Sequence, residues 1–295
     1  MSVPAAYLAV IVIWSTTPLT IKWSSDGLSY IAGVTGRMLI GTVICVMLVK
    51  LMRVSMPWHR QAVRAYAIGA LAVFAGMISV YWGAQYINSG LVALLFGLSP
   101  LATTVIAVTL GTESKPESSK LFGIMLALIG LFCVVLLDTS TTTLNTQSLY
   151  GMVAVFIGML FHSISTVWVK KIAQDLSAMS MTTGSLLLSM PLYLLVWVWV
   201  DGTIPTNIPT HALGSILYLS VFGSVLGYIF YFYTLRHVSA SNVVLITLIT
   251  PVTALLIGQA FNNEQVTAVV WFGTALIILG LAIHHWGHHM RPKPA

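Results

Sequence analysis

Residues 81–113 read YWGAQYINSGLVALLFGLSPLATTVIAVTLGTE, and residues 232–264 repeat the pattern as FYTLRHVSASNVVLITLITPVTALLIGQAFNNE. When the two stretches are aligned at an offset of 151 residues, Pro100 meets Pro251, and the flanking small and apolar positions also match. A pattern that recurs at a fixed distance indicates a duplicated structural unit. These two stretches therefore predict that the fold is built twice.

The duplication extends beyond these two stretches. At an offset of 150 residues Gly123 meets Gly273, and the segment WSTTPLTIK near the start of the chain resembles HSISTVWVK at 162–170. The sequence therefore predicts two copies of one unit, over residues 1–140 and 141–295.

Composition assigns the chain to a broad class of proteins. Of its 295 residues, 58% are apolar and only 7% are charged, and the mean hydropathy is +0.94. Soluble domains carry about 25% charged residues, and disordered chains are poor in apolar ones. A disordered protein is therefore excluded, a soluble enzyme is disfavoured, and a polytopic membrane protein is predicted. Continuous apolar runs that are long enough for membrane helices cover approximately 4–22, 29–50, 63–86, 89–111, 119–137, 149–170, 179–200, 213–235, 241–261 and 266–287.

Lysine and arginine set the expected orientation of these ten runs. Of the 13 basic residues, Arg37 lies inside the second run, Lys22 lies at the outer end of the first run, and the others all fall on one side of the membrane. Basic loops stay in the cytoplasm, so both termini are expected there. The residues on that side are Lys50, Arg53, Arg60, Arg64, Lys115, Lys120, Lys170, Lys171, Arg236, Arg291 and Lys293.

Each copy holds five runs, and an odd number reverses the direction of the second copy. We therefore expect an all-α integral membrane protein of ten transmembrane helices, arranged as two inverted-topology five-helix repeats around a central cavity. Inverted repeats suit alternating access, with the solute site near the bilayer midplane at the interface of the repeats.

These motifs resemble the drug/metabolite transporter superfamily, in the ten-helix branch built from two EamA-type repeats. The resemblance rests on the W-S-x-x-P start of the first run, the Arg37 neighbourhood, the stretches NSGLVALLFGLSPL and SASNVVLITLITPV, and two glycine pairs, Gly123 with Gly130 and Gly273 with Gly280. It implies that runs 1, 3, 4, 6, 8 and 9 line the cavity and that runs 5 and 10 are peripheral. It also implies movement of small organic solutes, often as export of amino acids or other metabolites.

Arg37 is the one strong charge well inside an apolar run. A buried charge costs a few kcal/mol in lipid on insertion scales, so it needs a partner or water. Its planar fork suits a substrate carboxylate. It equally suits backbone carbonyls that tie helix ends together, and the frequent occurrence of arginine here in the resembling family favours this structural role.

Pro18, Pro100 and Pro251 lie inside expected helices and are the candidate hinges, whereas Pro191 in the seventh run is expected to be structural. Proline removes a backbone donor and frees the carbonyl one turn earlier. Each proline is therefore either a hinge that lets its half of the protein flex or a static packing kink. Ser99 and Thr250 stand next to the duplicated pair of prolines, which makes them candidates for solute contact.

His162 and Trp14 occupy equivalent positions near the middle of the first helix of each copy. Neutral imidazole both donates and accepts hydrogen bonds and can take up a proton near pH 7, so His162 is either a functional residue or a hydrogen-bonded packing residue. Aromatic residues offer walls to a solute, but each can equally be a packing or lipid-facing residue. The candidate substrate-binding residues are Trp14, Thr17, Arg37, Tyr81, Ser99, His162, Tyr228 and Thr250.

Several chemistries have little basis in the sequence. No Asp or Glu lies deep in an apolar run, which argues against proton-driven export of polycationic drugs. The segment His284–His289 spaces histidines as a helical metal site would, but an interfacial polar cap is the simpler account, so no metal is expected. No HExxH, GxSxG or glycine-rich phosphate loop occurs, so neither catalysis nor a cofactor is expected. Nucleic-acid binding is not expected either, because the basic residues serve topology.

We therefore expect a multi-pass secondary transporter of the bacterial inner membrane that moves a small organic metabolite, an amino acid or a similar solute, by alternating access. The resemblance favours export. The alternative is an intramembrane enzyme or a signalling scaffold without transport. The expected partners are the small-molecule substrate and the lipid bilayer, and the sequence leaves both a monomer and a dimer open.

Reporter fusions test this topology. A reporter that is active only in the cytoplasm should be active when fused after residue 55 and inactive when fused after residue 140, because an odd number of expected helices separates the two positions. The measurement is reporter activity in intact cells, with a reporter that is active only outside the cytoplasm as the reciprocal control. Fusions that report the same side at both positions would contradict the inverted repeat.

Overall fold

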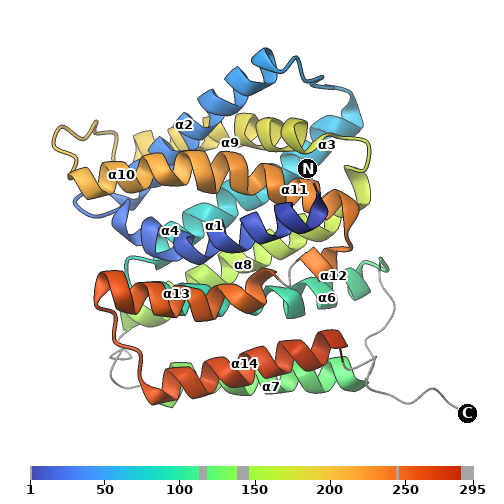
Figure 1. Ribbon diagram of the computed structural model, residues 1–295. Coiled ribbons are helices and arrows are strands. Elements are labelled where there is room, and N and C mark those ends of the chain that lie inside the picture. The colour runs from blue at the N-terminus through green and yellow to red at the C-terminus, as the bar shows by residue number, and fades with distance from the viewer. Residues whose placement is uncertain (1, 113–117, 138–145, 244–245, 287–295) are drawn as a thin grey trace, which may run out of the picture.

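The computed structural model describes residues 2–112, 118–137, 146–243 and 246–286. Across these residues the regular structure is entirely helical, with no strand, and the helices pack into one bundle (Figure 1). The elements are α1 Val3–Trp23, α2 Tyr30–Leu51, α3 Arg60–Leu71, η1 Ala72–Gly76, α4 Met77–Gly83, α5 Ser89–Phe96, α6 Ser99–Thr109, α7 Ser118–Leu137, α8 Thr146–Ile172, α9 Ala178–Val200, α10 Thr210–Tyr218, η2 Leu219–Leu226, α11 Gly227–His237, α12 Ala240–Val243, α13 Ile246–Asn262 and α14 Ala268–Trp286.

Seven helical segments in the described part of the chain are long and apolar enough to cross a membrane. Three shorter apolar helices lie at Leu121–Val134, Ile249–Asn262 and Ala268–Ile283. The all-helical membrane architecture expected from the sequence is confirmed, whereas the number of helices that cross the bilayer stays a prediction. The seven long segments are Val3–Ser24, Tyr30–Leu51, Arg60–Gly83, Ser89–Thr109, Thr146–Ile172, Ala178–Val200 and Thr210–His237.

Side chains are distributed as a lipid environment requires. Large apolar residues such as Leu195, Trp199 and Phe272 are exposed on the outside of the bundle, where lipid offers no hydrogen-bond partner to a polar group. Serine and threonine residues lie inside, and many of their hydroxyls donate to the carbonyl four residues earlier, as Ser15 does to Ile11 at 2.7 Å. The polar groups of the bundle are therefore gathered in its interior.

Helices from the two halves of the chain pack against one another in a reciprocal pattern. α1 packs against α11 and α13, whereas α8 packs against α4, α5 and α6. α2 packs against α9, and α7 packs against α14. The α7–α14 pair lies at one edge of the bundle (Figure 1). The first helix of each half thus contacts the third and fourth helical regions of the other half.

The α7–α14 pair is held by close backbone contact. A Cβ added to Gly130 would lie 2.5 Å from the Gly273 carbonyl oxygen, and one added to Gly280 would lie 2.5 Å from the Gly123 carbonyl oxygen. Only glycine permits this approach, and small residues let membrane helices gain van der Waals contact where lipid supplies no hydrophobic drive for association. The two glycine pairs noted in the sequence therefore form one packing seam.

Two π-helical segments interrupt the third and eighth expected runs at related positions. η1 lies between α3 and α4, and η2 lies between α10 and α11. At the offset of 151, Val73 in η1 corresponds to Ser224 in η2. The Val73 carbonyl accepts a hydrogen bond from the Tyr193 hydroxyl, and the Ser224 hydroxyl accepts one from Arg37. Each π segment thus accepts a hydrogen bond at the repeat-equivalent residue, η1 from Tyr193 of α9 and η2 from Arg37 of α2.

Replacing Gly130 with alanine should destabilise the α7–α14 pair. The added Cβ must displace backbone of α14, and overpacking of this kind costs about 1–3 kcal/mol. Thermal unfolding of the purified protein measures the effect. The matched control is Gly214→Ala in α10, where an added Cβ meets nothing within 4 Å. Equal unfolding temperatures for the two variants would show that the seam is not tightly packed.

Candidate functional site

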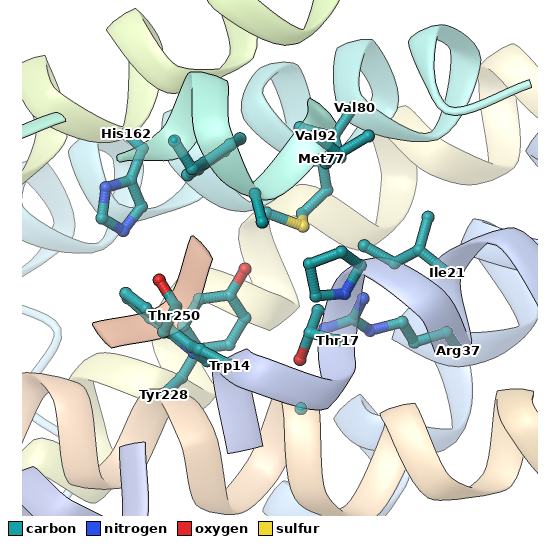
Figure 2. A pocket seen from close by; sticks show the side chains of 14 residues that line it. Trp14, Thr17, Ile21, Arg37, Met77, Val80, Val92, His162, Tyr228 and Thr250 are labelled. Carbon is teal, nitrogen blue, oxygen red and sulfur yellow. The ribbon is translucent and has the colours of Figure 1, made fainter. Parts of the chain in front are cut away.

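A cavity of about 70 Å³ lies between helices of both halves of the chain (Figure 2). Its walls come from α1, α2, α4, α5, α8, η2, α11 and α13, and neither α7 nor α14 contributes a side chain. The runs that the family resemblance assigned to the cavity all contribute, and the second run adds Arg37. The lining residues are Trp14, Thr17, Pro18, Ile21, Arg37, Met77, Val80, Val92, Ala93, Phe96, His162, Gly223, Tyr228 and Thr250.

Most of the candidate substrate-binding residues meet at this cavity. Those that line it are Trp14, Thr17, Arg37, His162, Tyr228 and Thr250. Tyr81 is fully buried behind the lining and reaches Arg37 through its hydroxyl. Ser99 is fully buried at the first residue of α6 and is not part of the lining.

The three prolines differ in their placement. Pro18 lies inside α1 and lines the cavity, and Pro251 lies inside α13. Pro100 does not kink the middle of a helix as expected. The helix is already broken at Gly97, and Pro100 stands in the first turn of α6, where its missing N–H is tolerated. A Cβ on Gly97 would lie 3.1 Å from Pro251 Cγ, so the break packs directly against the proline of the other half.

Pro18 leaves a carbonyl without its helical donor close to the cavity. It cannot donate to the carbonyl of Trp14, which lines the cavity. Membrane energetics favours such a freed carbonyl in the interior of the bundle rather than in lipid.

The Arg37 guanidinium is buried, with 2% of the residue exposed. Its Nε donates to the Ser224 hydroxyl at 2.8 Å, and its Nη1 donates to the Tyr81 hydroxyl at 3.4 Å. A Cβ on Gly223 would lie 2.7 Å from Nη2, so the missing side chain of Gly223 makes room for the guanidinium. Arg37 is thus positioned by α4 and η2 while it borders the cavity.

His162 stands among aromatic rings. Ring centroids lie 5.5 Å away for Trp14, 5.3 Å for Tyr231 and 6.1 Å for Phe96. His162 is 5% exposed, and its Nδ1 has no hydrogen-bond partner among the described residues. Thr166 fixes Tyr231 through a hydrogen bond between their hydroxyls. One residue of the cavity lining therefore has a buried ring nitrogen without a partner among the described residues, inside an aromatic enclosure.

Sequence reasoning did not identify Met77, Phe96, Gly223 and Tyr231. Gly223 carried a signal, because it forms the small-x-x-x-small pattern GSVLG with Gly227, which is typical of close helix approach. Met77, Phe96 and Tyr231 carried none, since an apolar or aromatic residue in an apolar run does not reveal which way it points.

The described residues contain no group of three or more His, Cys, Asp or Glu that would hold a metal ion. The histidine side chains of the segment His284–His289 lie outside the part of the chain that the structure describes.

Two further hollows lie at the C-terminal ends of α1 and of α8. One, of about 350 Å³, is lined by residues that include Lys22, Ala84 and Gln85. The other, of about 20 Å³, is lined by residues that include Lys170. Lys170 Nζ donates to the carbonyls of the last turn of α11, at 2.8 Å and 3.1 Å. Lys22 and Lys170 are counterparts in the repeat, so equivalent lysines border a wide hollow and a nearly closed one.

The buried carboxylate of Glu264 joins α13 to the start of α5. It accepts hydrogen bonds from the Ser89 hydroxyl at 2.8 Å, from the Ser89 backbone N–H at 3.1 Å and from the Gly90 N–H at 3.3 Å. A carboxylate at a helix N-terminus is favoured by the helix dipole. Lys22 Nζ lies 3.9 Å away. Glu113, the counterpart of Glu264 in the first copy, lies outside the described residues.

Replacing Tyr81 with phenylalanine should lower stability. The change removes an acceptor from a buried guanidinium, and an unsatisfied buried donor costs about 1–3 kcal/mol. Thermal unfolding of the purified protein measures this loss. The control is Tyr86→Phe in the turn after α4, because the Tyr86 side chain is exposed and no hydrogen bond of its hydroxyl occurs among the described residues. If the two variants lose the same amount of thermal stability, the Tyr81 hydroxyl does not stabilise the Arg37 guanidinium.

The chain is similar to known proteins over almost its whole length. The chain is 25% identical over 274 residues to an uncharacterized transporter of Archaeoglobus fulgidus. This alignment covers 92% of the present chain and 95% of the relative. It is 24% identical over 294 residues to the uncharacterized inner membrane transporter YedA of Escherichia coli strain K12. That alignment covers 98% of the present chain and 92% of YedA. A solved crystal structure shares the fold, with a TM-score of 0.74 over 98% of both chains at 14% identity.

The family model described as EamA-like transporter family matches the chain twice, at residues 3–136 and at residues 149–284. The two matches confirm that the family unit occurs twice, as the duplication in the sequence predicted. They cover nearly all of the chain, and the relatives are named transporters. The chain is thus a multi-pass membrane protein that belongs to the EamA-like transporter family, within the drug/metabolite transporter superfamily.

Proposed function

We propose that this protein is a secondary transporter that moves a small organic metabolite, an amino acid or a similar solute, out of the cell by alternating access. Ten helices cross the cytoplasmic membrane in this proposal, as two inverted five-helix repeats with both termini in the cytoplasm. The observation that carries the proposal is the cavity, because its lining combines residues from both matches to the transporter family. Solute sites of inverted-repeat transporters lie at such an interface.

The reciprocal packing supports the inverted arrangement. α1 meets α11 and α13, and its counterpart α8 meets α4, α5 and α6. An exchange of the two halves by a twofold axis in the membrane plane maps one set of contacts onto the other. Alternating access then follows from an exchange of conformation between the halves, with the same helices bounding the solute site throughout.

The two counterpart lysines support a cycle in which the ends of the bundle close in turn. Lys170 bonds to the carbonyls of Leu235 and Arg236, next to the nearly closed hollow. Ala84 and Gln85 are the equivalents of these two residues at the offset of 151, and they line the wide hollow together with Lys22. We assign this structure to an outward-facing state, in which the lysine closes the bundle only at the cytoplasmic end. In the inward-facing state Lys22 takes the equivalent role at the outer end.

Flux into proteoliposomes tests the proposal. A thermal-shift screen of the purified protein against amino acids, nucleobases, amines, sugars and organic acids first selects solutes. At least one of them should cross proteoliposomes faster than protein-free vesicles. Trp14→Ala should reduce that flux by about tenfold or more, because a cavity wall worth roughly 1.5 kcal/mol or more is lost. The control is Trp199→Ala, since Trp199 is 84% exposed and faces outward.

Two outcomes would contradict transport. One is flux equal to that of protein-free vesicles for every solute that stabilises the protein. The other is chemical alteration of a bound solute, which would favour an intramembrane enzyme.

A further inference from the structure

Arg37 carries a charge that the described protein does not neutralise. The ion pairs between described residues are Lys22 with Glu264 and His211 with Asp26, and neither involves Arg37. The partners of the guanidinium are the hydroxyls of Ser224 and Tyr81, which are neutral. Hydroxyls orient a guanidinium, but they leave its positive charge in place.

The acidic residues of the described chain are engaged or lie away from the cavity. Glu264 binds the start of α5, Asp26 pairs with His211, and Asp201 accepts hydrogen bonds from Ser29 and Thr203. No Asp or Glu belongs to the cavity lining that the described residues form. Ionisable residues within membrane segments are costly, and they pair with one another or mark a solute pathway. The counter-charge of Arg37 is therefore to be sought in the solute.

Polar groups border the cavity at two places. Figure 2 shows Arg37 at one end of the view and His162 at the other, with Tyr228 between them. The guanidinium uses Nε and Nη1 for its bonds within the described residues, and no bond of Nη2 occurs there. His162 lines the same cavity, and its Nδ1 is buried and has no partner among the described residues. Between these groups the lining is mainly apolar and aromatic.

We propose that the transported solute carries one carboxylate, which binds the Arg37 guanidinium, and an apolar body that lies along Trp14 and Tyr228. A guanidinium neutralises one negative charge and matches a carboxylate in shape. A phosphate dianion would keep an uncompensated negative charge, because Arg37 is the one Lys or Arg in the described lining. A cationic amine would face a like charge. The volume of about 70 Å³ fits a small molecule, since one water needs roughly 10–15 Å³ on the same scale.

The carboxylate site rests on the proposed transport function only because the cavity is taken as the solute site. Measuring the binding of solutes tests this site separately from the measurement of flux. The probes are matched acids and amides: acetate with acetamide, 4-methylpentanoate with 4-methylpentanamide, and leucine with leucinamide. Binding to the purified full-length protein is measured by calorimetry and thermal shift. At least one acid should bind about 30-fold or more tightly than its amide, as expected when one partner of a buried charge pair is missing. If no acid in the panel exceeds its amide, the proposal is wrong.

Variants at two positions assign the effect to the guanidinium. Arg37→Gln should abolish the preference for the acid, and Arg37→Lys should keep part of it, because an ammonium retains the charge without the planar fork. Gly223→Ala keeps Arg37 but places a Cβ 2.7 Å from Nη2, so it should weaken acid binding while Gly214→Ala does not. If the acid preference persists in both Arg37→Gln and Gly223→Ala, the carboxylate binds elsewhere and the proposal fails.

The two proposals fail in different ways. Acid-specific binding that depends on Arg37, without any flux, would reject transport and retain the carboxylate site. Flux of a neutral or cationic solute that is unchanged in Arg37→Gln would retain transport and reject the carboxylate site.

Discussion

Hydrocarbon offers no hydrogen-bond partner to a peptide group, and the rest of this structure depends on that constraint. The chain meets it by remaining helical throughout its described spans, and by placing several of its irregularities where other helices cover them. The break at Gly97 and the proline of α1 lie beside the cavity, and each π segment has a buried face, whereas Pro191 of α9 stands on the exposed surface. The peripheral helices α7 and α14 are continuous in the described residues. The cavity and part of the backbone irregularity thus share one location, where other helices shield freed backbone groups from lipid.

The same constraint explains how helices are joined. Without a hydrophobic drive between helices in lipid, close approach and polar contacts carry the association. Glycine pairs bring α7 and α14 into backbone contact, while Arg37, Tyr81, Tyr193 and Ser224 connect the helices nearer the cavity. The inner pair α4–α8 is also in close backbone contact, since a Cβ on Gly83 would lie 2.5 Å from the Gly151 carbonyl oxygen. Shape therefore joins both outer and inner helices, and hydrogen bonds are added near the cavity.

Much of this arrangement could be predicted from the sequence, and the failures have specific causes. Membrane location follows from composition, and the repeat follows from the aligned prolines and glycines. Arg37 and His162 were identifiable because an ionisable side chain is unusual in an apolar run, and Trp14 because it occupies the position equivalent to His162. Ser99 was assigned to the site through its neighbour Pro100, but the helix breaks one turn earlier than the proline, and Ser99 is not part of the lining. The π segments had no signal, since a shift from one hydrogen-bond register to the next leaves the apolar pattern almost unchanged.

The uncompensated charge of Arg37 has an electrical consequence for the proposed cycle. Water in an open vestibule carries the potential of its own side to the bottom of that vestibule. Reorientation of the empty protein therefore moves one positive charge through the membrane potential, which is worth about 2.3 kcal/mol per 100 mV. With the inside negative, this energy turns the empty site toward the cytoplasm. Once a monocarboxylate is bound, the site is neutral and reorients without regard to voltage. A resting cell would thus hold its empty carriers ready to load from within, and the potential would favour export although no ion accompanies the solute.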